Sequence, residues 1–122
     1  MQREYPDAPI VTVGLIVRRG DRVLLVQRGK EPNKGRWSIP GGAVEAGETL
    51  RAAAEREVRE ECNIEARAGE VAGVFEAIVP DDAGRARFHY VIIDFLAEYR
   101  GGELAAASDS AAARWVGLAE LS

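Results

Sequence analysis

One predicted helix, set between segments rich in β-branched residues, constrains the fold of this chain more than any other feature. Its sequence over residues 50–62 is LRAAAEREVREEC. The apolar side chains that recur at the i, i+4 spacing of one helix face are Leu50, Ala54, Val58 and Cys62. Thr49 is a suitable N-cap, and Asn63 can adopt the left-handed conformation that ends a helix. We therefore expect a helix that packs one face against a sheet.

The face beside this apolar stripe carries three carboxylates. Glu57, Glu60 and Glu61 lie at i, i+3 and i+4, so their side chains point in the same direction. Glu57 and Glu61 are like charges one turn apart, which destabilises an isolated helix by a few tenths of a kcal/mol. We expect a compensation from outside the helix, and a hard divalent cation is the natural one for clustered carboxylates. The alternative is an ordinary solvated face.

Most of the remaining chain predicts strands. They are expected at residues 10–17, 23–26, 37–39, 71–79, 88–99 and 114–116. The turn-forming residues 18–22 separate the first pair, and the turn-forming residues 80–84 separate the fourth and fifth strands, so each pair predicts a hairpin. Residues 91–93 are continuously apolar, which predicts a strand buried on both faces.

Composition excludes several classes of protein. A chain of 122 residues without repeats or a linker predicts a single domain. The net charge of −4 disfavours binding to a nucleic-acid backbone. Cys62 is the only cysteine, so no internal disulfide can form, and a zinc site of Cys and His is excluded. Since no export signal is recognisable and the apolar runs are too short for a bilayer, we expect a cytoplasmic protein that does not enter membranes.

The segment from Gly42 to Ile64 resembles the signature of the Nudix hydrolases. That signature is G-x5-E-x7-R-E-U-x-E-E-x-G-U, where U is a bulky apolar residue. The matching positions are Gly42, Glu48, Arg56, Glu57, Val58, Glu60, Glu61 and Ile64. Asn63 stands where the family has glycine, and asparagine tolerates the same positive φ angle. The resemblance implies an α/β fold over residues 1–122, an α/β/α sandwich with a central mixed β-sheet. Its C-terminal helix would be short or missing, because the sequence stops at Ser122.

The same resemblance implies a metal site on the acidic helix face. The groups expected to bind Mg²⁺, with Mn²⁺ as an alternative, are the carboxylates of Glu57, Glu60 and Glu61 and the carbonyl of Gly42. Magnesium suits them because it binds a few carboxylates together with substrate phosphate oxygens and lowers the pKa of bound water.

Three further residues have expected roles near that site. Arg56 and Glu48 would form a bidentate ion pair that braces the loop before the helix, a structural role. The general base is open between Glu57 and Glu98. Glu98 resembles a position that supplies a ligand or base in MutT-type members, but it would equally suit the surface end of a strand.

Substrate contacts are expected outside the helix. The candidates are Arg28, Arg36, Gly41, Gly42, Pro80 and Asp109. Pro80 lies sixteen residues after Ile64, which resembles the ADP-ribose pyrophosphatase subgroup, although a proline beside two aspartates also fits any turn. Asp109 resembles the base-reading acid of MutT-type enzymes, and it also fits an ordinary turn.

The sequence therefore predicts a magnesium-dependent pyrophosphohydrolase that cleaves a nucleoside diphosphate linked to another moiety. ADP-ribose or a related nucleotide sugar is the preferred substrate, and an oxidised purine nucleoside triphosphate is the alternative. A non-hydrolytic nucleotide sensor is disfavoured, because a sensor has no need to retain three repelling carboxylates. The expected partner is a small nucleotide, and a homodimer is considered because the second face of the sheet lacks its usual helix.

Overall fold

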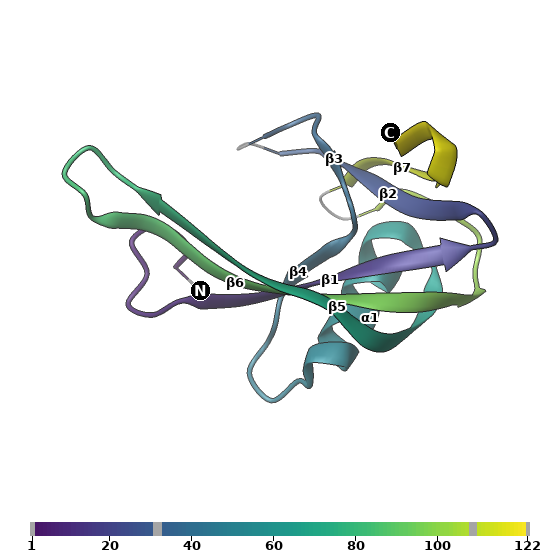
Figure 1. The fold of residues 1–122 in the computed structure, drawn as a ribbon, viewed down its shortest axis with the longest axis horizontal. Helices are drawn as coiled ribbons and strands as arrows, with labels where there is room; N and C mark the ends of the chain where they lie inside the picture. The colour runs from purple at the N-terminus through teal and green to yellow at the C-terminus, as the bar shows by residue number, and fades with distance from the viewer. Residues whose placement is uncertain (1, 31–32, 108–109, 122) are drawn as a thin grey trace.

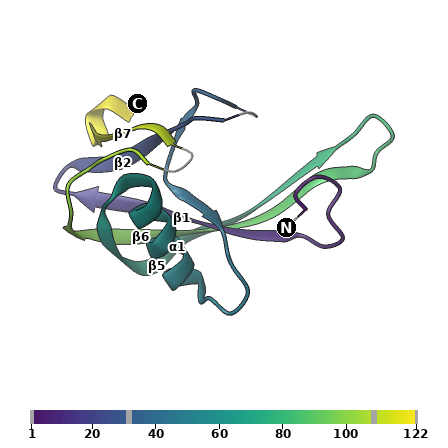
Figure 2. The same cartoon turned by 180° about the vertical axis from the view of Figure 1, so that it is seen from behind.

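In the part of the chain that the structure describes, one mixed sheet and one α-helix form the body of the molecule. The computed structural model describes residues 2–30, 33–107 and 110–121. Within them, the helix α1 (Leu50–Cys62) packs on one face of a seven-stranded sheet (Figures 1 and 2). The strands are β1 (Ile10–Arg19), β2 (Arg22–Arg28), β3 (Trp37–Ser38), β4 (Gly41–Ala43), β5 (Glu65–Pro80), β6 (Ala86–Gly101) and β7 (Ser110–Gly117). The predicted α/β class and mixed sheet are confirmed.

The sheet is built around a parallel pair of strands. Its order is β3-β2-β1-β6-β5, with β4 paired to β1 and β7 paired to β2. β1 and β6 run parallel, from Ile10 opposite Tyr90 to Arg18 opposite Glu98, and the other described pairs are antiparallel. The short strand β4 was not predicted, because its glycines have low strand propensity. It matters for function, since it joins the chain segment before α1 to the centre of the sheet.

The ends of α1 follow from its sequence. The Thr49 hydroxyl accepts a hydrogen bond from the Ala52 amide at 3.1 Å, and Asn63 adopts the left-handed conformation with φ of 58°. The helix residues buried against the sheet are Ala53, Ala54, Val58 and Cys62. Leu50 was expected among them but is 37% exposed. The small alanines let the helix lie close to the core side chains of β1 and β6, including Leu15 and Phe95.

The second face of the sheet carries no α-helix in the described part of the chain. Only the short 3₁₀ helix η1 (Leu118–Leu121) follows β7, so the expected short C-terminal layer is confirmed. Residues 91–93 are half-buried and not buried on both faces as predicted, since a helix covers only one side of β6. None of the described helices has the length and apolar character needed to cross a bilayer.

The hairpin of β5 and β6 is longer than predicted. The two strands pair from Glu65 opposite Gly101 to Pro80 opposite Ala86, with irregular register between Ala68 and Gly73. The half near α1 belongs to the compact body, whereas the other half projects beyond it (Figures 1 and 2). We call this projecting half, residues 71–93, the arm.

Candidate active site

Two carboxylates of α1 meet the backbone of β4. The Gly41 amide donates a hydrogen bond to Oε1 of Glu61 at 3.2 Å. Gly42 lies so close to Glu57 that a Cβ atom placed on Gly42 would be 2.6 Å from the Glu57 carboxyl carbon. Gly41 is equally restricted on its other side, because a Cβ there would be 2.1 Å from the Val13 carbonyl oxygen. The two glycines thus allow the acidic face of α1 to contact the centre of the sheet.

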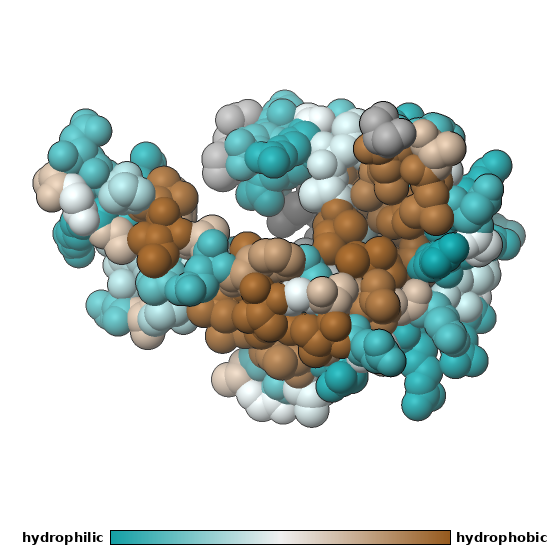
Figure 3. All heavy atoms as spheres, in the orientation of Figure 1, coloured by the Kyte–Doolittle hydropathy of each residue, from teal (hydrophilic) through white to brown (hydrophobic). Residues whose placement is uncertain are grey.

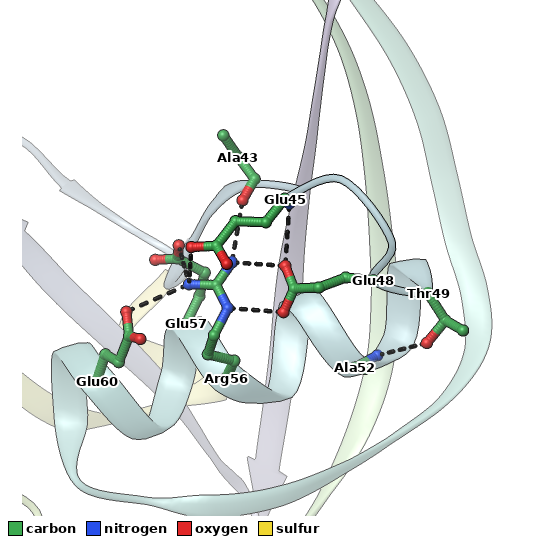
Figure 4. A network of polar contacts seen from close by, with 8 residues as sticks. All are labelled: Ala43, Glu45, Glu48, Thr49, Ala52, Arg56, Glu57 and Glu60. Atoms are coloured by element: carbon green, nitrogen blue, oxygen red, sulfur yellow. Dashed lines mark hydrogen bonds and ion pairs between the residues drawn. The ribbon is translucent and has the colours of Figure 1, made fainter. Parts of the chain in front are cut away.

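Arg56 is the centre of the polar network on this face (Figure 4). Its Nε and Nη2 donate to the two carboxylate oxygens of Glu48, at 2.7 and 2.9 Å. This is the bidentate pair expected from the sequence, and Nη2 also donates to the Ala43 carbonyl at 3.2 Å. Because both side chains are about four-fifths buried, with 17% and 20% exposed, the pair can fix the loop before α1 relative to the helix.

The remaining guanidinium nitrogen of Arg56 serves the acidic cluster itself. Nη1 donates to Oε1 of Glu57 at 2.9 Å and to Oε2 of Glu60 at 3.3 Å. The carboxylate repulsion was expected to need a compensation from outside the helix, but Arg56, which lies on the helix, already offsets part of it. Sequence reasoning assigned Arg56 only to Glu48 and missed this second role. The i, i+4 spacing of Arg56 and Glu60 was the available signal.

These contacts change the acidity of the groups involved. The hydrogen bond from Arg56 lowers the pKa of Glu48 to about 2, and a backbone hydrogen bond at Glu45 acts in the same direction. The hydrogen bond to Glu48 in turn raises the pKa of Arg56, with Glu57 contributing. Both groups therefore keep their charges at any pH at which the protein would work.

The acidic cluster offers the carboxylate oxygens that a divalent cation prefers, but these oxygens do not converge on one point. Across residues 2–30, 33–107 and 110–121, no three acidic, histidine or cysteine side chains are already arranged to hold a metal ion. Oε1 of Glu57 and Oε2 of Glu60 share Nη1 of Arg56, so they are at most about 6 Å apart. Oxygen ligands of magnesium lie about 2.1 Å from the ion.

Two of the predicted site residues lie away from this cluster. Glu98 pairs with Arg100 at 3.1 Å, and its side chain is 77% exposed. Since Ala97 is buried beneath α1, strand alternation directs Glu98 to the opposite face. Pro80 ends β5 at the far end of the arm. It lies roughly 40 Å along the strand from Ala68, the residue that bonds Glu55 of α1, at about 3.3 Å per residue. The structure does not bring either residue to the acidic cluster.

The basic candidates precede β4. Arg28 ends β2, and its amide donates to the Arg36 carbonyl at 2.9 Å, so the two residues are neighbours. Both are exposed, and Nε of Arg28 donates to the Lys30 carbonyl. Asp109 lies outside the described residues.

Comparison with known proteins identifies relatives of this chain. The NUDIX domain model matches residues 8–122. The ADP-ribose pyrophosphatase of Methanocaldococcus jannaschii is 34% identical over 93% of this chain. The chain spans only 64% of the length of that relative.

Solved structures give the same result. A MutT Nudix hydrolase of Burkholderia pseudomallei superimposes with a TM-score of 0.79 and 30% identity, over 93% of this chain and 86% of that one. A bifunctional NMN adenylyltransferase/ADP-ribose pyrophosphatase of Francisella tularensis, complexed with AMP and a manganese ion, gives a TM-score of 0.65 and 30% identity. That match covers 91% of this chain and 34% of that one. The chain belongs to the Nudix family.

Proposed function

We propose that this protein is a magnesium-dependent pyrophosphohydrolase that cleaves a nucleoside diphosphate linked to another moiety. One observation carries the proposal: Glu57 and Glu61 lie against the Gly41–Gly42 backbone, and Glu60 joins Glu57 at the guanidinium of Arg56. A solvated acidic surface would not require glycines at the positions that contact its carboxylates. The manganese ion in the Francisella structure supports a divalent cation, and Mn²⁺ is the natural alternative to Mg²⁺.

The three glutamates and the Gly42 carbonyl would hold the metal. When bound, the ion would neutralise diphosphate charge and lower the pKa of a water molecule. Hydrolysis would add the oxygen of a water molecule to one phosphorus of the substrate, break the bridging P–O bond and release the other phosphate. Between the two candidates for the general base, Glu57 lies in the cluster and Glu98 does not. We therefore assign the water proton to the Glu57 carboxylate, and we assign the positioning of the loop to Arg56 and Glu48.

ADP-ribose or a related nucleotide sugar is the substrate we favour. The names of the Methanocaldococcus and Francisella proteins support it. The MutT name of the Burkholderia protein keeps an oxidised purine triphosphate as the alternative. A small nucleotide also agrees with the net charge of −4, which does not suit a nucleic-acid backbone. The cytoplasmic location stays a prediction of the sequence.

A panel of substrates tests the proposal. Purified protein with Mg²⁺ would be offered ADP-ribose, other nucleotide sugars and ordinary and oxidised nucleoside triphosphates, and the products would be separated by chromatography. We expect AMP and ribose 5-phosphate from ADP-ribose. Release of pyrophosphate from a triphosphate would establish the alternative. Tight binding of a nucleotide without any product would instead identify a sensor.

Variants of the acidic face provide the matching control. Glu60→Gln and Glu61→Gln should abolish metal-dependent turnover while the thermal melting transition remains cooperative. Glu65→Gln is the matched control, since Glu65 is exposed and bonds only loosely to Arg59 at 3.5 Å. Full activity in both active-site variants would refute the assignment. Nothing in this proposal depends on the oligomeric state of the protein.

A further inference from the structure

The face of the sheet opposite α1 has a carboxylate set among apolar residues and glycines. Asp94 lies on β6 and points to this face, because its neighbour Phe95 is buried in the core beneath α1. The cross-strand partners of Asp94 are Gly14 on β1 and Gly73 on β5. Figure 3 views this face, and apolar side chains extend across it from the arm toward the C-terminal end. A carboxylate in such surroundings requires an explanation.

The two glycines beside Asp94 allow larger side chains to lie flat on the sheet. A Cβ placed on Gly14 would be 2.6 Å from Oδ1 of Asp94 and 2.9 Å from Cδ1 of Ile39. A Cβ placed on Gly73 would be 2.6 Å from the Cζ atom of Phe75. The side chains of Asp94, Ile39 and Phe75 therefore cover the glycines on one face. We call these five residues the outer platform.

The Asp94 carboxylate has no partner in the described part of the chain, where no group donates a hydrogen bond to it and no cation pairs with it. It is half-buried, and this loss of solvent raises the pKa of the Asp94 carboxyl above its ordinary value. The charge of Asp94 therefore opposes folding at neutral pH. A carboxylate kept at such a cost points to a role in binding, and a ligand with N–H groups would satisfy it.

The outer platform lies within reach of the acidic cluster. Gly41, Gly14 and Asp94 face each other on the adjacent strands β4, β1 and β6. Neighbouring strands are about 4.8 Å apart, so the Cα atoms of Gly41 and Asp94 are roughly 10 Å apart. The Gly41 amide donates to Glu61 of the cluster, and β4 pairs with β1 alone in the described sheet. A substrate can therefore pass around the free edge of β4, over a distance comparable with the length of a nucleotide.

We propose that the outer platform binds the nucleobase of the substrate, and that the Asp94 carboxylate accepts a hydrogen bond from the 6-amino group of adenine. This role rests on the proposed hydrolase activity, whose favoured substrate carries that base. The ring of Phe75 is 53% exposed and offers a stacking surface to a planar base. A purine without the amino group leaves the carboxylate without its donor. Asp94 is thus the residue that determines base specificity.

AMP tests the proposal by binding alone, since it contains no bond that a pyrophosphohydrolase cleaves. Purine riboside 5′-monophosphate is the matched ligand, because it lacks only the 6-amino group. In NMR titrations of the full chain with Mg²⁺ present, AMP should shift the amide signals of Gly14 and Gly73. AMP should also bind about 10-fold more tightly than the matched ligand, which is the effect of one hydrogen bond to a charged group.

Three variants separate the groups of the outer platform. Asp94→Ala should reduce the preference for AMP to less than about 2-fold. Phe75→Leu should weaken the binding of both nucleotides and keep the preference, because stacking does not depend on the amino group. Asp82→Ala is the matched control: Asp82 is an exposed acid in the turn between β5 and β6, and its loss should change neither affinity.

Thermal melting shows whether Asp94 serves binding or the fold. Because the charge of Asp94 opposes folding, Asp94→Ala should melt cooperatively, close to or above the wild-type temperature. A large loss of stability in this variant would overturn the proposal. Equal or absent binding of the two nucleotides by the wild type would overturn it as well, and so would a preference that Asp94→Ala retains. None of these results bears on the hydrolase assignment, which substrate turnover and the glutamine variants test separately.

Discussion

Gly42→Ala is the substitution that most directly tests the geometry of the acidic cluster. The new Cβ would lie 2.6 Å from the carboxyl carbon of Glu57 and 2.7 Å from both of its oxygens. Ordinary contacts are about 3.5–4.0 Å, so the carboxylate must move by about 1 Å. A misplacement of that size near the reacting atoms can reduce the rate by about 100-fold. The fold should tolerate the change, because only the end of a flexible side chain has to move.

The assay has two readouts. Steady-state kinetics with Mg²⁺ should show a fall in kcat, while thermal melting should stay close to that of the wild type. Gly101→Ala is the matched control, since its Cβ would meet nothing within 4 Å, and it should change neither readout. Gly41→Ala is the opposite case. Its Cβ would lie 2.1 Å from the Val13 carbonyl oxygen, so it should destabilise the fold itself.

A double variant shows whether Gly42→Ala acts through Glu57. If it does, Gly42→Ala should cause no further loss in a protein that already carries Glu57→Gln, because coupled residues are not additive. Wild-type turnover in Gly42→Ala would refute the reasoning. A large loss of stability in Gly42→Ala would also refute it, since the fold itself, and not only the position of Glu57, would then require glycine at this position.

Three more predictions concern the Arg56–Glu48 ion pair, the pKa of Glu48 and the binding of Mg²⁺. Arg56→Lys keeps the charge but not the bidentate geometry, so the melting temperature should fall by roughly 4–8 °C, whereas the exposed control Arg59→Lys should change little. Because the pKa of Glu48 is lowered from 4.5 to about 2 in the folded protein, the stability that it contributes is complete above pH 4.5 and is lost as the pH falls toward 2. Urea unfolding across that range should show a smaller loss in Glu48→Gln. Saturating Mg²⁺ should raise the melting temperature by several degrees, and this rise should shrink in Glu57→Gln; a melting curve indifferent to the metal would contradict a site on α1.

The sequence predicted the local elements whose signals are themselves local. The Thr49 cap, the Asn63 end and the apolar stripe of α1 depend on residues within a turn of each other, and the structure reproduces them apart from Leu50. The bidentate pair of Arg56 and Glu48 was also foreseen, because the signature places both residues around one loop.

Features that depend on tertiary contacts were missed or wrong. β4 was not predicted, since its strand geometry comes from pairing with β1 and not from its own glycines. The burial of residues 91–93 was overestimated because periodicity cannot show whether a second layer exists. Pro80 is a similar case. Its spacing from Ile64 in the sequence suggested a substrate contact, but the long extended strand β5 places it far from the acidic cluster.

The parallel pairing of β1 and β6 has a consequence for how this chain folds. Residues that face each other across this pair, such as Ile10 and Tyr90, are eighty positions apart, whereas β5 and β6 are joined by a short turn. Closing a long loop costs more entropy than closing a short one, so we expect the β5–β6 hairpin to form before β1 joins it. φ-values should then be high in that hairpin and low in β1. During synthesis, β1 must wait until residues 86–101 have been made before its parallel partner exists.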